Sequence, residues 1–146
     1  MSNNDIGTTI EAVQALPATF DVAGYEALTF VKVNGLVSIG ELGDDHAGIA
    51  VPDLETGRSK TVKGELTGTT SPITFRQVDA DTGQALMKTI CAGRAESSFK
   101  ITEPNGDIYY VSGVGMSYKR MERSVSSYAG FSCQITNNYD VVEDLA

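Results

Sequence analysis

Short segments rich in β-forming residues, each bounded by glycine, proline or asparagine, recur along most of this chain. The clearest lies near the C-terminus, where Ala129, Phe131, Cys133 and Ile135 alternate with Ser132, Gln134 and Thr136. This period of two predicts a strand with one buried and one solvated face. Further strands are expected at residues 28–33, 36–42, 73–78, 98–102, 107–113 and 114–118. The chain is therefore predicted to be mainly β.

The dipeptide Asn34-Gly35 separates the first two of these segments. Asparagine followed by glycine suits the left-handed positions of a two-residue turn, and apolar β segments flank it on both sides. Residues 28–42 are therefore predicted to form a tight hairpin.

One segment has helical rather than strand periodicity. Asp81 or Thr82 is expected to cap its start, because either side chain can accept from the free amides of a first turn. Gly93 is expected to end it in a left-handed conformation. Its apolar face is formed by Leu86, Met87, Ile90 and Cys91. Strands, one helix and more strands predict an α+β or mainly β fold, an antiparallel β-sandwich with one flanking helix.

Residues 46–72 differ from their surroundings, because they are polar and rich in glycine. Short strands are expected at residues 47–51 and 60–63, on either side of residues 52–59. The region is predicted to be a long, exposed β-hairpin loop. Loops of this length in a compact domain are usually functional or disordered.

A chain of 146 residues suits one domain with one core. Residues 1–18 are polar, and Pro17 would stop the weak helical spacing of Ile10, Val13 and Leu16. The predicted organisation is an N-terminal arm at residues 1–24, a β-sandwich domain at residues 25–138 and a C-terminal tail at residues 139–146. Both terminal arms are expected to be flexible.

The net charge of −8 gives the chain no overall basic footprint for holding nucleic acid. Acidity aids solubility in any protein, and it would also suit a wall past which DNA slides. The basic residues form two small clusters, and we expect them to be solvated or to meet acidic patches on another copy of the chain. The clusters are Arg58, Lys60 and Lys63, and Lys119, Arg120 and Arg123.

Cys91 and Cys133 lie far apart in sequence, and neither belongs to a CxxC pair. Both have apolar neighbours, so they are predicted to be reduced and packed in the core. No apolar run approaches the ~20 residues of a membrane span. The first residues lack the charged-then-apolar order of a signal peptide.

Groups that would support catalysis are missing. His46 follows Asp44 and Asp45 in a glycine-bordered segment, and a lone histidine there is expected to be solvated. The sequence has no GxSxG nucleophile elbow and no phosphate-binding GxxxxGK[ST] loop. No enzyme activity, cofactor or metal is predicted.

The order of these segments resembles that of the major tail proteins, which form the tube of siphophage-type tails. The resemblance covers residues 25–138. It rests on the spacing of residues 28–33, 37–43, 54–58, 63–64, 79–93, 99–101 and 104–106.

This resemblance implies a structural virion protein, assembled in the host cytoplasm, whose hexameric rings stack into a tube around a tape-measure protein. The inner strands of each ring would join into a continuous barrel through which DNA passes transiently and without specific binding. Tail terminator and distal tail proteins would be further partners, and no membrane is involved. A terminator or head–tail completion ring, a tube-forming secretion protein and a small β-sandwich binding module remain alternatives.

The long hairpin loop is the expected contact between stacked rings. It carries cations although the chain as a whole is acidic. It also carries apolar side chains, which would gain nothing from burial if the loop stayed free in solvent. The candidate contact residues are Val51, Asp53, Leu54, Glu55, Thr56, Gly57, Arg58, Lys60, Val62 and Lys63. The net charge further predicts an acidic channel wall.

Overall fold

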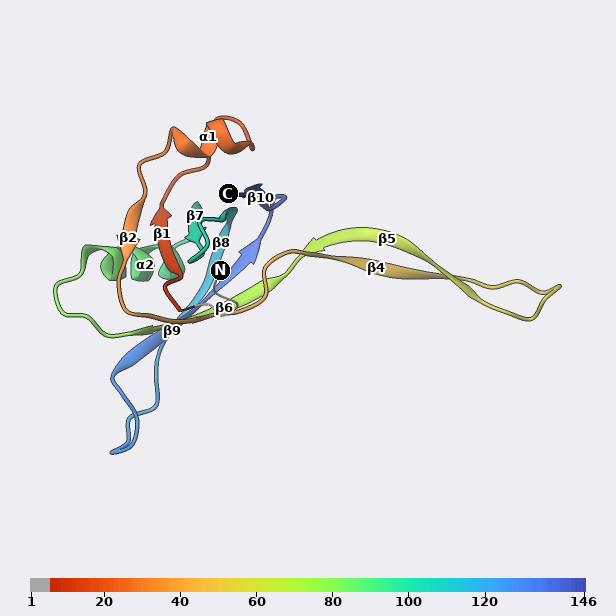
Figure 1. The fold of residues 1–146 in the computed structure, drawn as a ribbon. Coiled ribbons are helices and arrows are strands. Elements are labelled where there is room, and N and C mark those ends of the chain that lie inside the picture. Colours follow the sequence, from red (N-terminus) through yellow and green to blue (C-terminus); the bar gives the residue numbers. More distant parts are fainter. Residues whose placement is uncertain (1–5) are drawn as a thin grey trace.

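The computed structural model describes residues 6–146 of the chain (Figure 1). In chain order the elements are β1 (Thr9–Val13), α1 (Val22–Glu26), β2 (Val31–Val33), β3 (Leu36–Ile39), β4 (Asp44–Val51), β5 (Lys60–Gly68), β6 (Thr70–Arg76), α2 (Thr82–Ala92), β7 (Glu96–Thr102), β8 (Ile108–Arg120), β9 (Gly130–Asn137) and β10 (Val142–Asp144).

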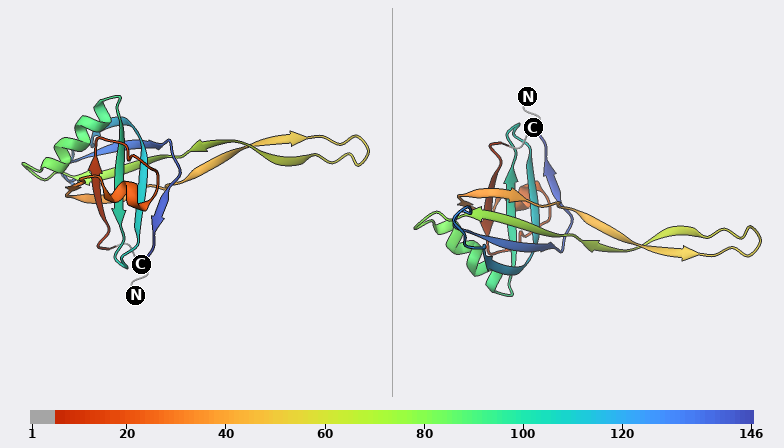
Figure 2. Two further views of the ribbon diagram at one scale, coloured as in Figure 1. Left: turned by 90° about the horizontal axis from the view of Figure 1, so that it is seen from above. Right: turned by 90° about the horizontal axis from the view of Figure 1, so that it is seen from below.

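One antiparallel sheet contains most of these strands, in the order β2-β1-β7-β8-β9-β6-β3, with β10 added beside β8. The sheet folds over on itself at β8. The first half of this 13-residue strand pairs with β7 and β10, and its second half pairs with β9. We call β2, β1, β7, the first half of β8 and β10 layer A. Layer B is the second half of β8 with β9, β6 and β3 (Figure 2).

The core lies between the two layers, and α2 packs against it. Buried side chains of layer A, such as Ile10 and Phe99, join those of layer B, such as Ile73 and Phe131, in one cluster. Met87 and Ile90 of α2 are fully buried in the same cluster. The predicted antiparallel, mainly β fold with a flanking helix is therefore confirmed.

The fold over at β8 depends on close backbone approach at two glycines. A Cβ on Gly113 would lie 1.9 Å from the Thr136 carbonyl oxygen, and one on Gly115 would lie 2.7 Å from the Cys91 Cα. Only glycine fits at these distances, so β9 and α2 can press against the bend. The strand expected through these two glycines is continuous, with a register shift between Gly115 and Ser117.

The hairpin predicted around Asn34-Gly35 is wrong. β2 pairs with β1 and β3 pairs with β6, so the two strands stand at opposite ends of the sheet order. Gly35 has the expected positive φ of 82°, but it turns the chain from layer A to layer B. The Gln84 side chain donates 2.7 Å bonds to the carbonyls of Asn34 and Arg76, and Asp81 accepts from Asn34. Side chains at the start of α2 thus take the hydrogen bonds that a tight turn would otherwise form.

The expected N-terminal arm contains a central strand. β1 lies between β2 and β7, and Ile10 and Ala12 are fully buried. The alternation of Ile10 and Ala12 with polar neighbours has the period of a strand, whereas the helical spacing in this stretch has no structural counterpart. A short helix that was not predicted, α1, follows, capped by the 2.7 Å bond from Gly24 N to Asp21. The first part of the expected arm, residues 1–5, lies outside the described residues.

The expected C-terminal tail also adds a strand. β10 pairs with the start of β8, where Val142 faces Tyr110. The Tyr139 hydroxyl donates a 2.7 Å bond to Glu96, and the Tyr139 ring stacks on Phe20 at 4.4 Å. These contacts fix residues 139–144 against layer A, which an acidic composition alone does not indicate.

Helix α2 forms where it was predicted. Asp81 is the N-cap, and its carboxylate accepts from Gln84 N at 3.1 Å. Gly93 ends the helix, but with extended backbone (φ −90°) instead of the expected left-handed conformation. Cys91 on this helix and Cys133 on β9 are both buried and free, so their predicted packing in the core is confirmed.

Candidate assembly surfaces

The region predicted as a long exposed hairpin is a two-stranded ribbon, β4–β5, that projects far from the body (Figure 1). Every residue of β4 is exposed, and the side chain of Leu54 near the tip is fully exposed. Val51 and Val62 are about half exposed. The prediction of an exposed hairpin here is confirmed, and the strands are longer than expected, at 8 and 9 residues.

All ten candidate contact residues lie in the outer part of this ribbon and its tip. They include three cations, Arg58, Lys60 and Lys63, and two carboxylates, Asp53 and Glu55. Within the described part of the chain the one ion pair lies elsewhere, between Lys100 and Glu11. The tip therefore carries a small positive excess on an acidic chain, together with unburied apolar side chains.

The ribbon prolongs layer B. β3 leads through residues 40–43 into β4, and β5 runs into β6 after one residue. Backbone bonds continue the pattern across the junction, from Thr69 N to Gly43 O at 2.9 Å and from Asn137 N to Thr69 O at 3.2 Å. The hairpin therefore projects beyond one end of layer B, in the direction of its strands (Figure 2).

A second projection stands at the opposite end of layer B. Thr70 pairs with Thr136 beside the hairpin, whereas Arg76 pairs with Gly130 at the far end, where residues 121–129 connect β8 to β9. This connection presents Val125, which is fully exposed, and Tyr128, which is 44% exposed. Layer B thus has exposed apolar side chains beyond both of its ends. The sequence gives no periodic signal for Val125, and only the strand register shows which end it occupies.

Layer B also has two open edges. Within residues 6–146, β3 pairs only with β6. The second half of β8, beyond Gly115, pairs with β9 on one side, and β7 reaches only as far as Val114 on the other. Unpaired strand edges are templates for association with another chain. Local sequence pattern does not identify which strands form these edges, because edges follow from strand pairing over long distances.

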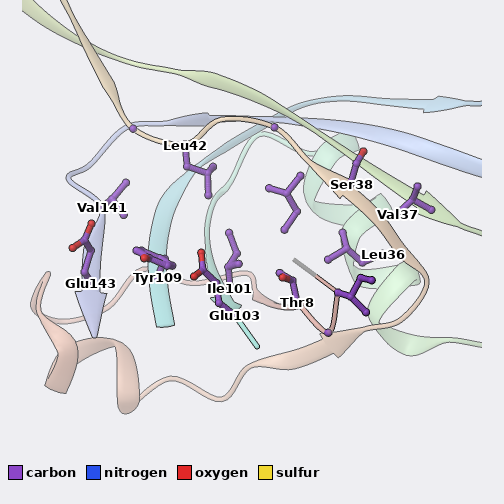
Figure 3. Close-up of a pocket in the computed structure, with 15 residues that line it drawn as sticks. Thr8, Leu36, Val37, Ser38, Leu42, Ile101, Glu103, Tyr109, Val141 and Glu143 are labelled. Carbon is purple, nitrogen blue, oxygen red and sulfur yellow. The ribbon is translucent and has the colours of Figure 1, made fainter. Parts of the chain in front are cut away.

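A groove of about 930 Å³ with both apolar and polar lining residues runs along the β3 edge (Figure 3). Its β3 side is formed by residues 36–40, 42 and 43, and Ile101 and Tyr109 lie across from Leu42. Glu103 and Glu143 add carboxylates to its lining. A strand placed beside β3 would cover this groove, so the edge offers apolar burial in addition to backbone hydrogen bonds.

His46, Asp44 and Asp45, the residues considered for a catalytic or metal site, all lie in β4. His46 lies in β4, a strand instead of the expected loop, and is exposed opposite Leu66. Asp44 and Asp45 accept hydrogen bonds from Asn137 and Thr69 at 3.3 Å. No cluster of three or more His, Cys, Asp or Glu side chains placed to hold a metal occurs within residues 6–146. The hydrogen bond with Cys91, together with burial, raises the pKa of Cys133.

Helices in the described part of the chain are too short or too polar to cross a membrane.

Comparisons with known proteins give a fold but no family. No protein-family model and no curated protein sequence matches the chain. Solved structures do match. The SPP1 tail tube aligns with a TM-score of 0.65 and 10% identity over 95% of this chain and 77% of that one. A chain of the native gene transfer agent virion aligns with a TM-score of 0.62 and 15% identity over 98% and 99% of the two chains.

A contractile system shares the fold. A chain from the sheath/tube terminator structure of an extracellular contractile injection system aligns with a TM-score of 0.60 and 11% identity, over 94% of this chain and 92% of that one. A chain of the anti-feeding prophage baseplate aligns with a TM-score of 0.65 and 7% identity, over 99% and 97% of the two chains. The fold alone therefore does not separate the types of tail. This chain has a tail-tube-like fold, in which layer B has two open edges and a projecting hairpin.

Proposed function

We propose that this chain is the repeating subunit of the tube of a long non-contractile phage tail. Rings of the subunit would stack around a tape-measure protein, end at tail terminator and distal tail proteins, and later conduct DNA. The observation that supports this most is the pair of open edges on layer B, β3 on one side and the second half of β8 on the other. The non-contractile assignment rests on the resemblance of the sequence to siphophage-type major tail proteins.

Strand directions in layer B suit closure into a ring. Each pair along the order β8-β9-β6-β3 is antiparallel, so β8 and β3 run in opposite directions. Rotation about a ring axis preserves these directions. The β8 edge of one copy would therefore meet the β3 edge of the next copy as an antiparallel pair. Closure removes both exposed edges, which are a hazard in a monomer.

A hexameric ring would enclose an open channel. Sixfold symmetry is named for the matching gene transfer agent tail and anti-feeding prophage baseplate. Six copies of a four-stranded layer, with strands about 4.8 Å apart, would make a barrel roughly 37 Å across between backbones if the strands were parallel to its axis, and strand tilt would make it wider. Barrels of fewer strands already enclose an aqueous channel.

Stacking would use the two ends of layer B. The hairpin leaves one end of a ring and residues 121–129 leave the other, so head-to-tail stacking brings Leu54 of one ring towards Val125 of the next. Such a contact joins two different patches, the hairpin of one subunit and residues 121–129 of another. Repetition of a contact between different patches builds an open filament. Ring symmetry multiplies each weak contact, so rings can associate where single subunits would not.

Replacing residues 53–63 with a short Gly-Ser linker tests this function. The core, the open edges and α2 are untouched, so the variant should fold with an unchanged thermal midpoint. We expect it to form no tubes under conditions where the wild type does, when both are imaged by negative-stain electron microscopy. Normal tubes from this variant would assign stacking to another segment, such as the N-terminal residues or the chain after Asn137.

Two alternatives have distinct outcomes in the same experiment. A terminator or head–tail completion protein would give single rings from the wild type as well as from the variant, and structures of a sheath/tube terminator and a tube-terminating cap are among those with this fold. A β-sandwich binding module would stay monomeric at all concentrations.

A further inference from the structure

Layer B differs in composition from the rest of the molecule. Its strands β3, β6, β8 and β9, of 4, 7, 13 and 8 residues, contain no aspartate or glutamate. The whole chain has 19 such residues, and layer A alone includes Glu11, Glu96 and Glu143. The strands of layer B therefore contain none of the carboxylates of this acidic chain.

The two faces of layer B have different partners. Buried residues such as Ile73, Phe75 and Cys133 point towards layer A and α2. The opposite face is not covered by any element of the described chain, and strand register defines its side chains. They are Ser38, Thr70, Pro72, Thr74, Arg76, Val114, Ser117, Lys119, Ser132, Gln134 and Thr136. Two exposed apolar residues, Val37 and Met116, lie at the register shifts of β3 and β8.

Hydroxyl and amide groups dominate this uncovered face. The hydroxyls of Thr70 and Thr136 share a 2.8 Å hydrogen bond across β6 and β9. The two cations, Arg76 and Lys119, both lie towards the end of the layer that is far from the hairpin. The middle of the face is uncharged.

A ring closed through β3 and β8 puts this face inside. Layer A and α2 cover the other face of layer B. In a ring closed through layer B these elements would lie behind it, where the circumference is larger. The uncovered face then becomes the inner surface of the barrel.

We propose that this carboxylate-free face of layer B lines the channel, and that the middle of the channel wall is uncharged hydroxyl and amide surface suited to the passage of a nucleic-acid duplex. Arg76 and Lys119 would then lie towards the end of the wall that is far from the hairpin. This proposal replaces the acidic wall expected from net charge, because the carboxylates of the chain lie on its other surfaces. The inference rests on the proposed tube. A wall rich in cations would hold phosphates through counterion release, and a wall of carboxylates would repel them. Hydroxyl groups exchange hydrogen bonds with water at little net cost, so a hydroxyl surface neither holds nor repels phosphates.

Position in the channel is tested by thiol accessibility. Gln134→Cys places a thiol at the centre of the face, and Lys32→Cys places a matched one on an exposed residue of layer A. The native cysteines are buried and serve as the unlabelled background. A polyethylene-glycol maleimide too bulky to enter the channel should label position 134 more than about tenfold more slowly in assembled tubes than in dissociated subunits. A small maleimide should label position 134 both in tubes and in dissociated subunits. Position 32 should react with both reagents in both states.

The charge of the wall is tested by adding one cation to it. Tubes of wild type and of Gln134→Lys are mixed with short duplex DNA at low salt, treated with nuclease and sedimented. The lysine variant should retain more protected DNA than the wild type, and salt should release that additional DNA steeply, because the new cation lies in the uncharged middle of the wall. Thr29→Lys, a matched added charge on an exposed residue of the body, should behave as the wild type.

Several results would overturn the inference. Equal reaction of positions 134 and 32 with the bulky reagent in tubes would place the face outside, as would DNA retention by Thr29→Lys but not by Gln134→Lys. Equal amounts of nuclease-resistant DNA in wild-type and Gln134→Lys tubes would contradict an uncharged middle of the wall. Ser132→Cys, a near-isosteric change on the same face, replaces Gln134→Cys if that variant does not assemble. If the wild type makes no tubes, the proposed function fails and this inference with it, whereas tubes with the wrong labelling pattern refute only the inference.

Discussion

The body and the β4–β5 hairpin are built from the same antiparallel strands, but only the body has a core. In the body, Phe99, Ile73 and Phe131 are at most 2% exposed and pack between two layers and a helix. In the hairpin, Ile49, Val51 and Val62 are about half exposed and face solvent on a two-stranded ribbon. An isolated two-stranded hairpin is marginally stable in water.

The difference separates residues that specify the fold from residues available for assembly. Burial explains why apolar side chains occupy alternate positions in the body. It does not explain the apolar residues of the hairpin, since they bury nothing within the subunit. A second copy that covers them would supply the missing explanation, so changes in the two regions should affect different measurements.

The largest effect on assembly is expected at the tip of the hairpin. Leu54→Asp should raise the protein concentration needed for tube formation by roughly 10- to 100-fold, because a leucine buried at a contact contributes about 1.5–3 kcal/mol. Light scattering against concentration measures this threshold. Leu145→Asp changes another exposed leucine and should have no effect. A threshold that moves for Leu145→Asp alone would assign stacking to the C-terminal residues.

A large effect on stability is expected in the body. Phe99→Ala should lower the free energy of unfolding by about 3–5 kcal/mol, because it removes a fully buried ring from between the layers. Ile49→Ala in the hairpin should change it by less than about 0.5 kcal/mol. Urea denaturation monitored by circular dichroism gives both values. Similar losses for the two variants would show that the hairpin belongs to the folding core.

A change at the Asn34-Gly35 turn, where the chain passes from layer A to layer B, should have an intermediate effect on stability. Gln84 is 8% exposed, donates to the Asn34 and Arg76 carbonyls and accepts from Val78 N at 3.0 Å. Gln84→Ala leaves these backbone groups unpaired and should cost about 2–3 kcal/mol of stability. Gln134→Ala removes an exposed glutamine and is the control. No loss on Gln84→Ala would mean that the turn is held by other contacts.

The smallest effect concerns a buried tyrosine. Burial raises the pKa of Tyr25, whose hydroxyl shares a 2.6 Å hydrogen bond with Ser112. The unfolded chain ionises this tyrosine near pH 10. The stability that depends on the neutral hydroxyl is therefore complete below pH 10 and is lost as pH rises further. Tyr25→Phe should cost about 1 kcal/mol at pH 7 and should make the decline above pH 10 shallower.

Chemical denaturation at several pH values measures this dependence. Tyr128→Phe, at an exposed position, should leave the stability at pH 7 unchanged. An equally steep alkaline decline in the Tyr25→Phe variant would contradict the role given to Tyr25.

Local pattern predicts the elements of this fold better than their pairing. The alternation of Phe131, Cys133 and Ile135 predicts β9, and an Asp81 cap with an apolar face predicts α2. The pairing of β2 and β3 with different partners depends on Gln84, 50 residues after Asn34. No local signal carries that information.

The same limit applies to the assembly surfaces. The hairpin is predictable, because its composition differs from that of its surroundings. The open edges of β3 and β8 and the position of Val125 become visible only with strand order and register. The absence of carboxylates from four strands is present in the sequence, but only the register of Ser132, Gln134 and Thr74 shows that one uncovered face results.

Negative-stain electron microscopy of the concentrated wild-type protein tests the central claim most directly, because it shows the assembled state without any substitution. We expect long, hollow filaments of a single diameter, with an axial repeat of one ring. Their length should vary, because nothing in the chain counts copies. Protein that remains monomeric over the whole concentration range would contradict the account, since the open edges of layer B would then not join one copy to the next.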